Sequence, residues 1–446
     1  MKKLILSVLL IPAVFSAQQT VSRDAEIANY VSQVSADSLK SHINKLVSFG
    51  TRHTMSSTTD AKKGIGAARN WVLSKFKNYA KNSDGRMEVF LQSQTIQPDG
   101  KRINQPTDLG NAIAILRGTD PNDKRIFMIG GHLDSRVSDV MNAKDFAPGA
   151  NDDGSGVGAV IESARILSQS KFPATIIFVA FSGEEQGLLG AKMLAEKAKN
   201  ENWQLEALLN NDMIGNNLTS ETNLINANQL RVFSEGLPQF DLDKKAQGIR
   251  NLGLENDGEA RQLARYIKEV GERYVDNLEV KLIYRNDRFL RGGDHTSFVN
   301  QGFSAVRLTE FNENYDHQHQ DIRKENGKQF GDLPEFMDFE YFKKNVGVNV
   351  SVLANLAKSP SKPENVKMDV KELTNFTTIH WEKPKNGEVV GYYVLMRETD
   401  SSIWQKKFFT KENSMKLPYS KDNYFFAVQA VNSSGNESLI VIPSVK

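Results

Sequence analysis

Carboxylate and imidazole side chains in this chain gather just after apolar segments, where they could bind a metal ion or transfer protons. The apolar run 125–130 is followed by Gly-His-Leu-Asp, the run 174–181 by Ser-Gly-Glu-Glu, and the run 205–209 by Asn-Asn-Asp. A glycine-rich segment with two aspartates lies at 148–156, and an acidic and histidine-rich stretch lies at 310–321. One such side chain alone is usually a helix cap or a surface group, but this many together favour a site. The side chains concerned are His132, Asp134, Asp152, Asp153, Glu184, Glu185, Asp212, Glu310, His317 and His319.

The types of side chain limit the chemistry. The 446 residues contain no cysteine, so cysteine nucleophiles and thiolate metal sites are excluded. Imidazole nitrogen and carboxylate oxygen are ligands that suit zinc, and a catalytic zinc site keeps one coordination position open. Carboxylate-rich sites can also hold two ions about 3.5–4 Å apart. The sequence therefore predicts a zinc centre built from His, Asp and Glu.

The elements that must position these side chains form an α/β pattern. Near-continuous apolar runs are typical of strands that are buried on both faces of a sheet. They alternate with amphipathic segments, among them a helix around 157–167, which predicts a largely parallel sheet flanked by helices. Ligands bind beyond the carboxyl ends of the strands in such sheets, where the acidic and histidine residues lie. The predicted strands are 112–116, 125–130, 174–181 and 303–308.

The chain divides into segments of different character. Lys2 and Lys3, an apolar run at 4–15 and small residues up to Ala17 are typical of a secretory signal peptide at 1–17. The run is shorter than the roughly 20 apolar residues that span a bilayer. We therefore expect export to the periplasm or the outside of the cell, without a membrane span.

A second, smaller domain is predicted at the C-terminal end. We expect a catalytic α/β domain at 18–358, a linker rich in Pro and Ser at 359–363, and an all-β sandwich at 364–446. The 56 basic and 54 acidic residues nearly balance, which gives no electrostatic case for binding nucleic acid or an anionic membrane.

The motifs together resemble a known family, the di-zinc aminopeptidases of metallopeptidase family 28 in clan MH. The resemblance covers about residues 39–357 and includes Phe-Gly-Thr-Arg-His at 49–53. It rests on HLD, GxNDDGSG, GEEQGLLG, NxDMIG, GDH and a final HxxxD, each weak alone and specific together. The C-terminal segment resembles a fibronectin type III module, a candidate for contacting another protein or a surface.

The resemblance implies a role for each residue. Two Zn²⁺ ions are expected, with Asp152 bridging both, His132 and Asp212 completing one set of ligands, and Glu185 and His317 the other. Glu184 is expected as the general base, and Asp134 as the partner that fixes the His132 imidazole. The peptide bond after Asp152 is expected to be cis.

Some of these assignments have alternatives. His317 and Asp321 fit the family spacing of a histidine four residues before an aspartate, whereas His319 is the less favoured ligand. We expect Asp294 and His295 to be structural or to support the ligands.

The resemblance implies removal of single residues from peptides with a free N-terminus, by a hydroxide that bridges the two ions. One alternative is another exopeptidase on the same scaffold, such as a carboxypeptidase, for which Arg291 and Arg307 could hold a C-terminal carboxylate. A glutaminyl cyclase is disfavoured because the pair Asp152–Asp153 is intact. A catalytically inert binding or adhesion protein is disfavoured because Glu184 and all the expected ligands are present.

Overall fold

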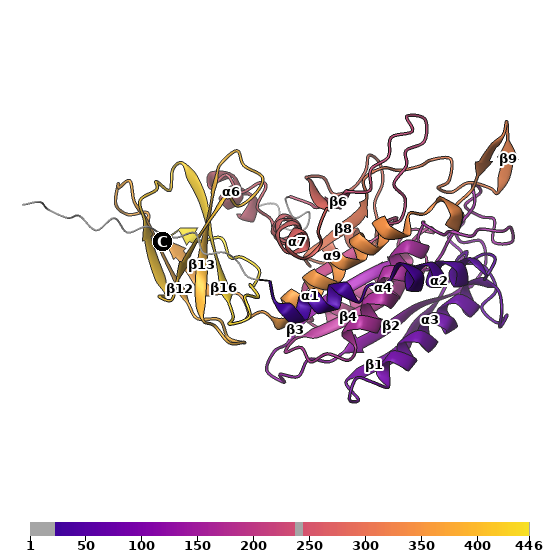
Figure 1. The fold of residues 1–446 in the computed structure, drawn as a ribbon, viewed down its shortest axis with the longest axis horizontal. Helices are drawn as coiled ribbons and strands as arrows, with labels where there is room; N and C mark the ends of the chain where they lie inside the picture. Colours follow the sequence, from indigo (N-terminus) through magenta and orange to yellow (C-terminus); the bar gives the residue numbers. More distant parts are fainter. Residues whose placement is uncertain (1–22, 237–243, 446) are drawn as a thin grey trace, which may run out of the picture.

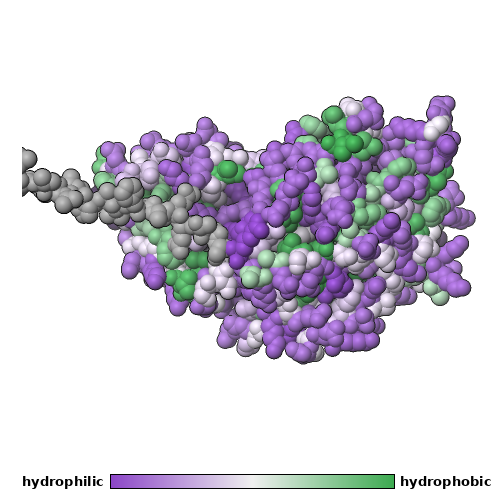
Figure 2. Space-filling model, viewed as in Figure 1, coloured by the Kyte–Doolittle hydropathy of each residue, from purple (hydrophilic) through white to green (hydrophobic). Residues whose placement is uncertain are grey.

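A computed structural model describes residues 23–236 and 244–445. The expected signal peptide at 1–17 lies outside the described residues. No helix within the described part is long and apolar enough to cross a membrane. The face drawn in Figure 2 is largely hydrophilic, with apolar side chains in small patches.

An eight-stranded mixed sheet forms the centre of the larger domain (Figure 1). Its strands lie in the order β1-β2-β4-β3-β5-β8-β6-β7. The neighbours β4, β3, β5 and β8 are parallel to one another, and antiparallel pairs flank this parallel core. The strands are β1 (Met87–Ile96), β2 (Thr107–Leu116), β3 (Arg125–His132), β4 (Thr175–Phe181), β5 (Gln204–Asn211), β6 (Gln229–Phe233), β7 (Glu279–Ile283) and β8 (Ala305–Glu310).

Helices bury both faces of this sheet. In β4, Ile176 and Phe178 belong to one hydrophobic core, while Ile177 and Val179 belong to the core on the opposite face. This alternation follows from the pleat of a strand and explains why every residue of β4 after Thr175 is apolar. One face carries α1 (Ala25–Ser32), α2 (Ala36–Val47), α3 (Gly64–Ala80), α4 (Gly154–Leu167), α7 (Glu259–Tyr274) and α9 (Phe339–Lys358). The other carries α5 (Leu189–Asn200) and α8 (Asp294–Val299).

The smaller domain is a β-sandwich of two sheets, ordered β15-β12-β11-β17 and β14-β13-β16. Trp381 and Tyr392 pack in its core with ring centroids 5.3 Å apart. The predicted all-β C-terminal domain is thus present. Its strands are β11 (Glu364–Met368), β12 (Thr377–Glu382), β13 (Gly391–Glu398), β14 (Lys406–Thr410), β15 (Ser414–Leu417), β16 (Tyr424–Val431) and β17 (Ser444–Val445).

Short elements complete the described fold. A hairpin of β9 (Arg323–Glu325) and β10 (Lys328–Phe330) and the 3-10 turn η1 (Pro334–Phe336) precede α9. Helix α6 (Lys244–Asn251) lies between β6 and α7 along the chain, beside the sandwich in Figure 1.

Candidate metal centre

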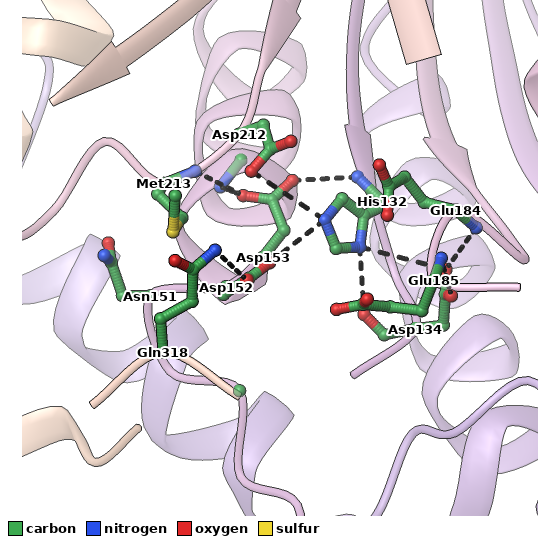
Figure 3. Close-up of polar contacts among 12 residues, drawn as sticks. His132, Asp134, Asn151, Asp152, Asp153, Glu184, Glu185, Asp212, Met213 and Gln318 are labelled. Carbon is green, nitrogen blue, oxygen red and sulfur yellow. Dashed lines mark hydrogen bonds and ion pairs between the residues drawn. The ribbon is translucent and has the colours of Figure 1, made fainter. Parts of the chain in front are cut away.

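The carboxyl ends of the parallel strands bring most of the expected residues together (Figure 3). His132 is the last residue of β3, Glu184 and Glu185 follow β4, and Asp212 follows β5. Asp152 comes from the loop that enters α4. The predicted convergence of these separate segments on one edge of the sheet is therefore what the structure shows.

Two sets of ligand atoms meet at Asp152. The Nε2 atom of His132 lies 3.1 Å from Oδ1 of Asp152 and 3.9 Å from Oδ1 of Asp212. The Nε2 atom of His319 lies 2.9 Å from Oδ2 of Asp152 and 2.9 Å from Oε1 of Glu185. Within each set, the possible ligand atoms all lie within 4.8 Å of one another. Asp152 thus presents one oxygen to each set.

The expected ligand His317 lies outside both sets of ligand atoms. Its imidazole stacks on Phe336, with ring centroids 3.7 Å apart and planes at 10°. Among the described residues it belongs to no group able to hold a metal, whereas His319 does. The backbone at His319 has a φ of 54°, and at this turn the imidazole of His319 is the one that reaches Asp152 and Glu185. The family spacing of a histidine four residues before an aspartate favoured His317 because spacing alone does not describe this turn.

Asp134 acts differently from what the resemblance implies. Its carboxylate accepts hydrogen bonds from the backbone N–H groups of Gly183, Glu184 and Glu185, at 2.9, 3.2 and 3.0 Å. The Nδ1 atom of His132 lies 3.0 Å from the backbone oxygen of Asp134 and 3.8 Å from its carboxylate. The carbonyl therefore orients the imidazole, and the carboxylate holds the turn that carries both glutamates.

The second aspartate of the pair ties three segments to each other. The carboxylate of Asp153 accepts from the backbone N–H groups of His132 and Gly156, each at 2.8 Å, and of Met213 at 3.1 Å. The end of β3, the start of α4 and the end of β5 are fixed in this way. The bond between Asp152 and Asp153 is cis, as expected.

Negative charge dominates this buried edge. Burial raises the pKa of Glu184 well above its usual range, and the nearby carboxylates of Glu185 and Asp212 add to the effect. Burial opposes the charged form of His319, yet Glu185 and Asp152 raise the pKa of its imidazole to about 10. Bound cations would relieve this excess charge, and the imidazole and carboxylate donors are those that zinc prefers. The residues present therefore fit a zinc centre.

Comparison with known proteins agrees with this chemistry. The sequence profile of peptidase family M28 matches residues 111–333. A probable zinc metalloprotease of Leptosphaeria maculans is 43% identical over 94% of this chain and 97% of its own length. One of Pyrenophora teres f. teres is 42% identical over 94% of this chain and 87% of its own length. The chain belongs to peptidase family M28. Its C-terminal residues 361–443 match the fibronectin type III (fn3) domain.

Solved structures of two aminopeptidases share the fold. The match to the LapA aminopeptidase of Legionella pneumophila spans 77% of this chain and 77% of the LapA chain, with a TM-score of 0.53 and 20% identity. The match to an aminopeptidase from Aneurinibacillus sp. strain AM-1 spans 75% of this chain and 96% of that aminopeptidase, with a TM-score of 0.50 and 16% identity. At such identities the likeness concerns the fold alone.

Several residues around this M28 centre were not anticipated. Asp332 accepts from the backbone N–H of Asp152 at 2.7 Å, and burial raises the pKa of its carboxyl to about 7. The side-chain amide of Gln318 donates to Asp152 at 3.0 Å, and Arg136 donates to Glu185 at 2.9 Å. Arg136 lies two residues after the HLD motif, and this position could have marked it as part of the site. Asp332 lies in a loop without a motif that could have marked it.

Arg307 and the Gly-Asp-His loop border the same centre. Arg307 is fully buried, with one Nη atom 3.0 Å from Asp287 and the other 3.0 Å from Asp212. Its charge is thus compensated by two carboxylates. His295 contacts the backbone oxygen of Asn286 at 2.8 Å. Neither Asp294 nor His295 belongs to a metal-holding group in the described part of the chain.

Proposed function

We propose that this protein is a di-zinc aminopeptidase that hydrolyses the first peptide bond of peptides with a free N-terminus. The observation that carries the proposal is the placement of Asp152, whose two carboxylate oxygens each face a separate histidine at 3.1 and 2.9 Å. A carboxylate shared in this way suits a pair of ions about 3.5–4 Å apart.

The ligands divide into two sets under this proposal. His132, Asp152 and Asp212 would hold one ion, and Asp152, Glu185 and His319 the other. A third possible grouping joins His132 to Glu184 and Glu185. The first two sets already use His132 and Glu185, which leaves Glu184 free for proton transfer.

The zinc ions, when bound, supply acidification of a water molecule and polarisation of the peptide carbonyl. Glu184 takes the proton from that water at its carboxylate and returns it to the leaving amine. Asp134 keeps Glu184 in place through the backbone bonds described above. The buried, negatively charged surroundings that raise the pKa of Glu184 favour a carboxyl that can carry a proton between the two steps.

Selection of the N-terminus is supported by two observations. The acidic edge offers carboxylates that can pair with a free α-ammonium group, and the proteins with a similar fold include those named aminopeptidases. The carboxypeptidase alternative needs an uncompensated basic group, but Arg307 is already paired with Asp212 and Asp287. Of the two arginines considered, only the exposed Arg291 could still hold a C-terminal carboxylate.

Blocked peptides provide the test. Purified protein loaded with zinc is incubated with a free peptide, the same peptide N-acetylated, and the same peptide C-amidated. We expect stepwise release of N-terminal residues from the free and amidated peptides and none from the acetylated one. Cleavage of the acetylated peptide together with protection by the amide would instead identify a carboxypeptidase, and no cleavage of any peptide would favour an inert protein.

We also propose that the protein is exported, on the basis of the charged and apolar segment at residues 1–17. Expression with this segment and recovery of a product that starts at Gln18 outside the cytoplasm would support export. Retention of the full-length chain in the cytoplasm would contradict it.

A further inference from the structure

The linker between the two domains is held firmly. Arg125 is buried and its guanidinium donates to the backbone oxygens of Ser359 and Pro360, at 2.8 and 3.0 Å. The same guanidinium forms an ion pair with the buried carboxylate of Asp123 at 2.6 Å. A chain segment clamped at two consecutive carbonyls does not act as a loose tether for the fn3 domain.

Buried ion pairs also cross the domain interface in both directions. Glu437 of the fn3 domain accepts two bonds from Arg273 of α7, at 2.7 and 2.8 Å. Arg397 of the fn3 domain pairs with Asp257 of the catalytic domain at 2.5 Å. All four side chains are largely removed from water. Helix α7 is thus joined to the fn3 domain (Figure 1).

One contact of this interface lies directly after β7. The hydroxyl of Tyr284 donates to the backbone oxygen of Ser402 in the fn3 domain at 2.7 Å. Arg265 donates to the same oxygen, also at 2.7 Å. The ring of Tyr284 packs beneath Arg261, whose guanidinium lies 4.0 Å from the ring centroid. The fn3 domain therefore fixes the residue at which the segment 284–293 begins.

From Tyr284 the segment 284–293 runs to the metal centre. Asp287, three residues on, pairs with Arg307 at 3.0 Å, and Arg307 lies 3.0 Å from Asp212. The tip of the segment receives little support, because Phe289 is 79% exposed and Leu290 fully exposed. Its position consequently depends on its base and on the ion pairs of Asp287 and its neighbour Arg288.

We propose that the fn3 domain supports the segment 284–293, and that Tyr284 is a positioning residue through which this support reaches the Asp212 side of the metal centre. The proposal rests on the proposed function only for the role of Asp212 as a metal ligand. It assigns to the fn3 domain a part in shaping the catalytic site in addition to any contact with outside partners.

Two matched variants of the full-length protein test this idea. Tyr284→Phe removes only the hydroxyl that bonds to Ser402. Tyr266→Phe removes an equivalent hydroxyl of α7, which donates to the backbone oxygen of Glu437 at the same distance of 2.7 Å. The Tyr266 bond is the more buried, so the control is expected to cost at least as much overall stability. Amide hydrogen exchange of residues 284–293 and kcat/KM on a free dipeptide are measured for both.

A single hydrogen bond of this kind changes an opening equilibrium by about twofold to tenfold. We expect exchange in 284–293 to accelerate by that factor in Tyr284→Phe, with a fall in kcat/KM of similar size, and neither change in Tyr266→Phe. Wild-type exchange in 284–293 for Tyr284→Phe, or equal acceleration in both variants, would overturn the proposal. Hydrogen exchange does not require turnover, so a protein that cleaves no dipeptide would refute the proposed function and still test this one.

Discussion

The metal-centre edge and the domain interface both bury carboxylates, but they balance the charge differently. At the interface, Glu437 meets Arg273 and Lys407, and Asp257 meets Arg397 and Arg265. At the sheet edge, the carboxylates exceed the arginines Arg136 and Arg307 that pair with them within the described chain. The carboxylates at that edge are Asp134, Asp152, Asp153, Glu184, Glu185, Asp212 and Asp294.

The difference separates a structural cluster from a functional one. Burying a charge is costly unless an opposite charge or a metal compensates it. The interface satisfies this condition with protein groups alone, so it contributes to stability and domain orientation. At the sheet edge, His319 and the two arginines compensate only part of the negative charge, and bound cations would relieve the rest, which makes the same side-chain chemistry a candidate binding site. Each prediction below tests one side of this contrast.

The largest effect is expected from Asp152→Asn, because that side chain serves both sets of ligands. The variant should lose zinc from both positions and all measurable turnover. Zinc at 100 times its dissociation constant stabilises a folded protein by about 2.7 kcal/mol, so added zinc should raise the Tm of the wild type and not of the variant. Metal analysis and thermal unfolding with and without a chelator measure this. If the variant still binds two zinc ions, Asp152 does not bridge them.

Glu184→Gln should separate chemistry from binding at the same edge. Loss of a general base costs about 10²–10⁴-fold in rate. We expect kcat to fall by that factor while the zinc content stays at the wild-type level, since the proposal leaves Glu184 without a metal. Turnover within a fewfold of wild type would rule out Glu184 as the base, and loss of zinc would show that it is a ligand.

At the interface, Glu437→Ala should affect stability and leave the metal in place. Removing one partner of a buried pair typically costs about 3–5 kcal/mol, because the other charge is left uncompensated. Arg117→Ala, at an exposed pair with Glu88, is the control and should cost at most about 1 kcal/mol. Denaturant unfolding and zinc analysis measure both. Loss of zinc in Glu437→Ala would show that the interface is needed for metal binding, which contradicts a purely structural role for it.

The smallest effect concerns His317, the histidine that the family spacing favoured. Burial lowers the pKa of its imidazole to about 4, from about 6.5 in an unfolded chain. The unfolded state then binds more protons, so this group makes stability fall as the pH drops from about 6.5 to about 4.

His317→Phe keeps an aromatic ring on Phe336 and removes the titration. The metal-free variant should lose less stability than the wild type over this pH range, by at most about 1 kcal/mol because the imidazole is partly exposed. Urea unfolding at several pH values shows whether this is so. Parallel pH curves for the two proteins would count against a buried neutral His317.

The central strands and most of the site were predictable, for a physical reason. The run at 174–181 is apolar except for Thr175 because both faces of β4 are covered, and the acidic residues that follow it mark the ligand edge. The strands β1, β6 and β7 were not predicted. They lie toward the edges of the sheet, and β1 and β7 leave most of their positions partly exposed, so their apolar pattern is weak.

The errors within the site arise from backbone geometry and tertiary contacts. Whether His317 or His319 points inward depends on a left-handed turn, which residue spacing does not encode. The carboxylate of Asp134 holds the turn at Glu184 because the end of β3 lies beside the end of β4, a relation that only the folded sheet creates. The family resemblance pointed to residues that the fold brings together, except His317, and it could not give these partners.

Anomalous scattering at the zinc edge from crystals grown with zinc tests the central claim most directly. We predict two peaks on opposite sides of the Asp152 carboxylate, one beside His132 and Asp212 and the other beside Glu185 and His319. A single peak, or a second peak coordinated by His317, would contradict it.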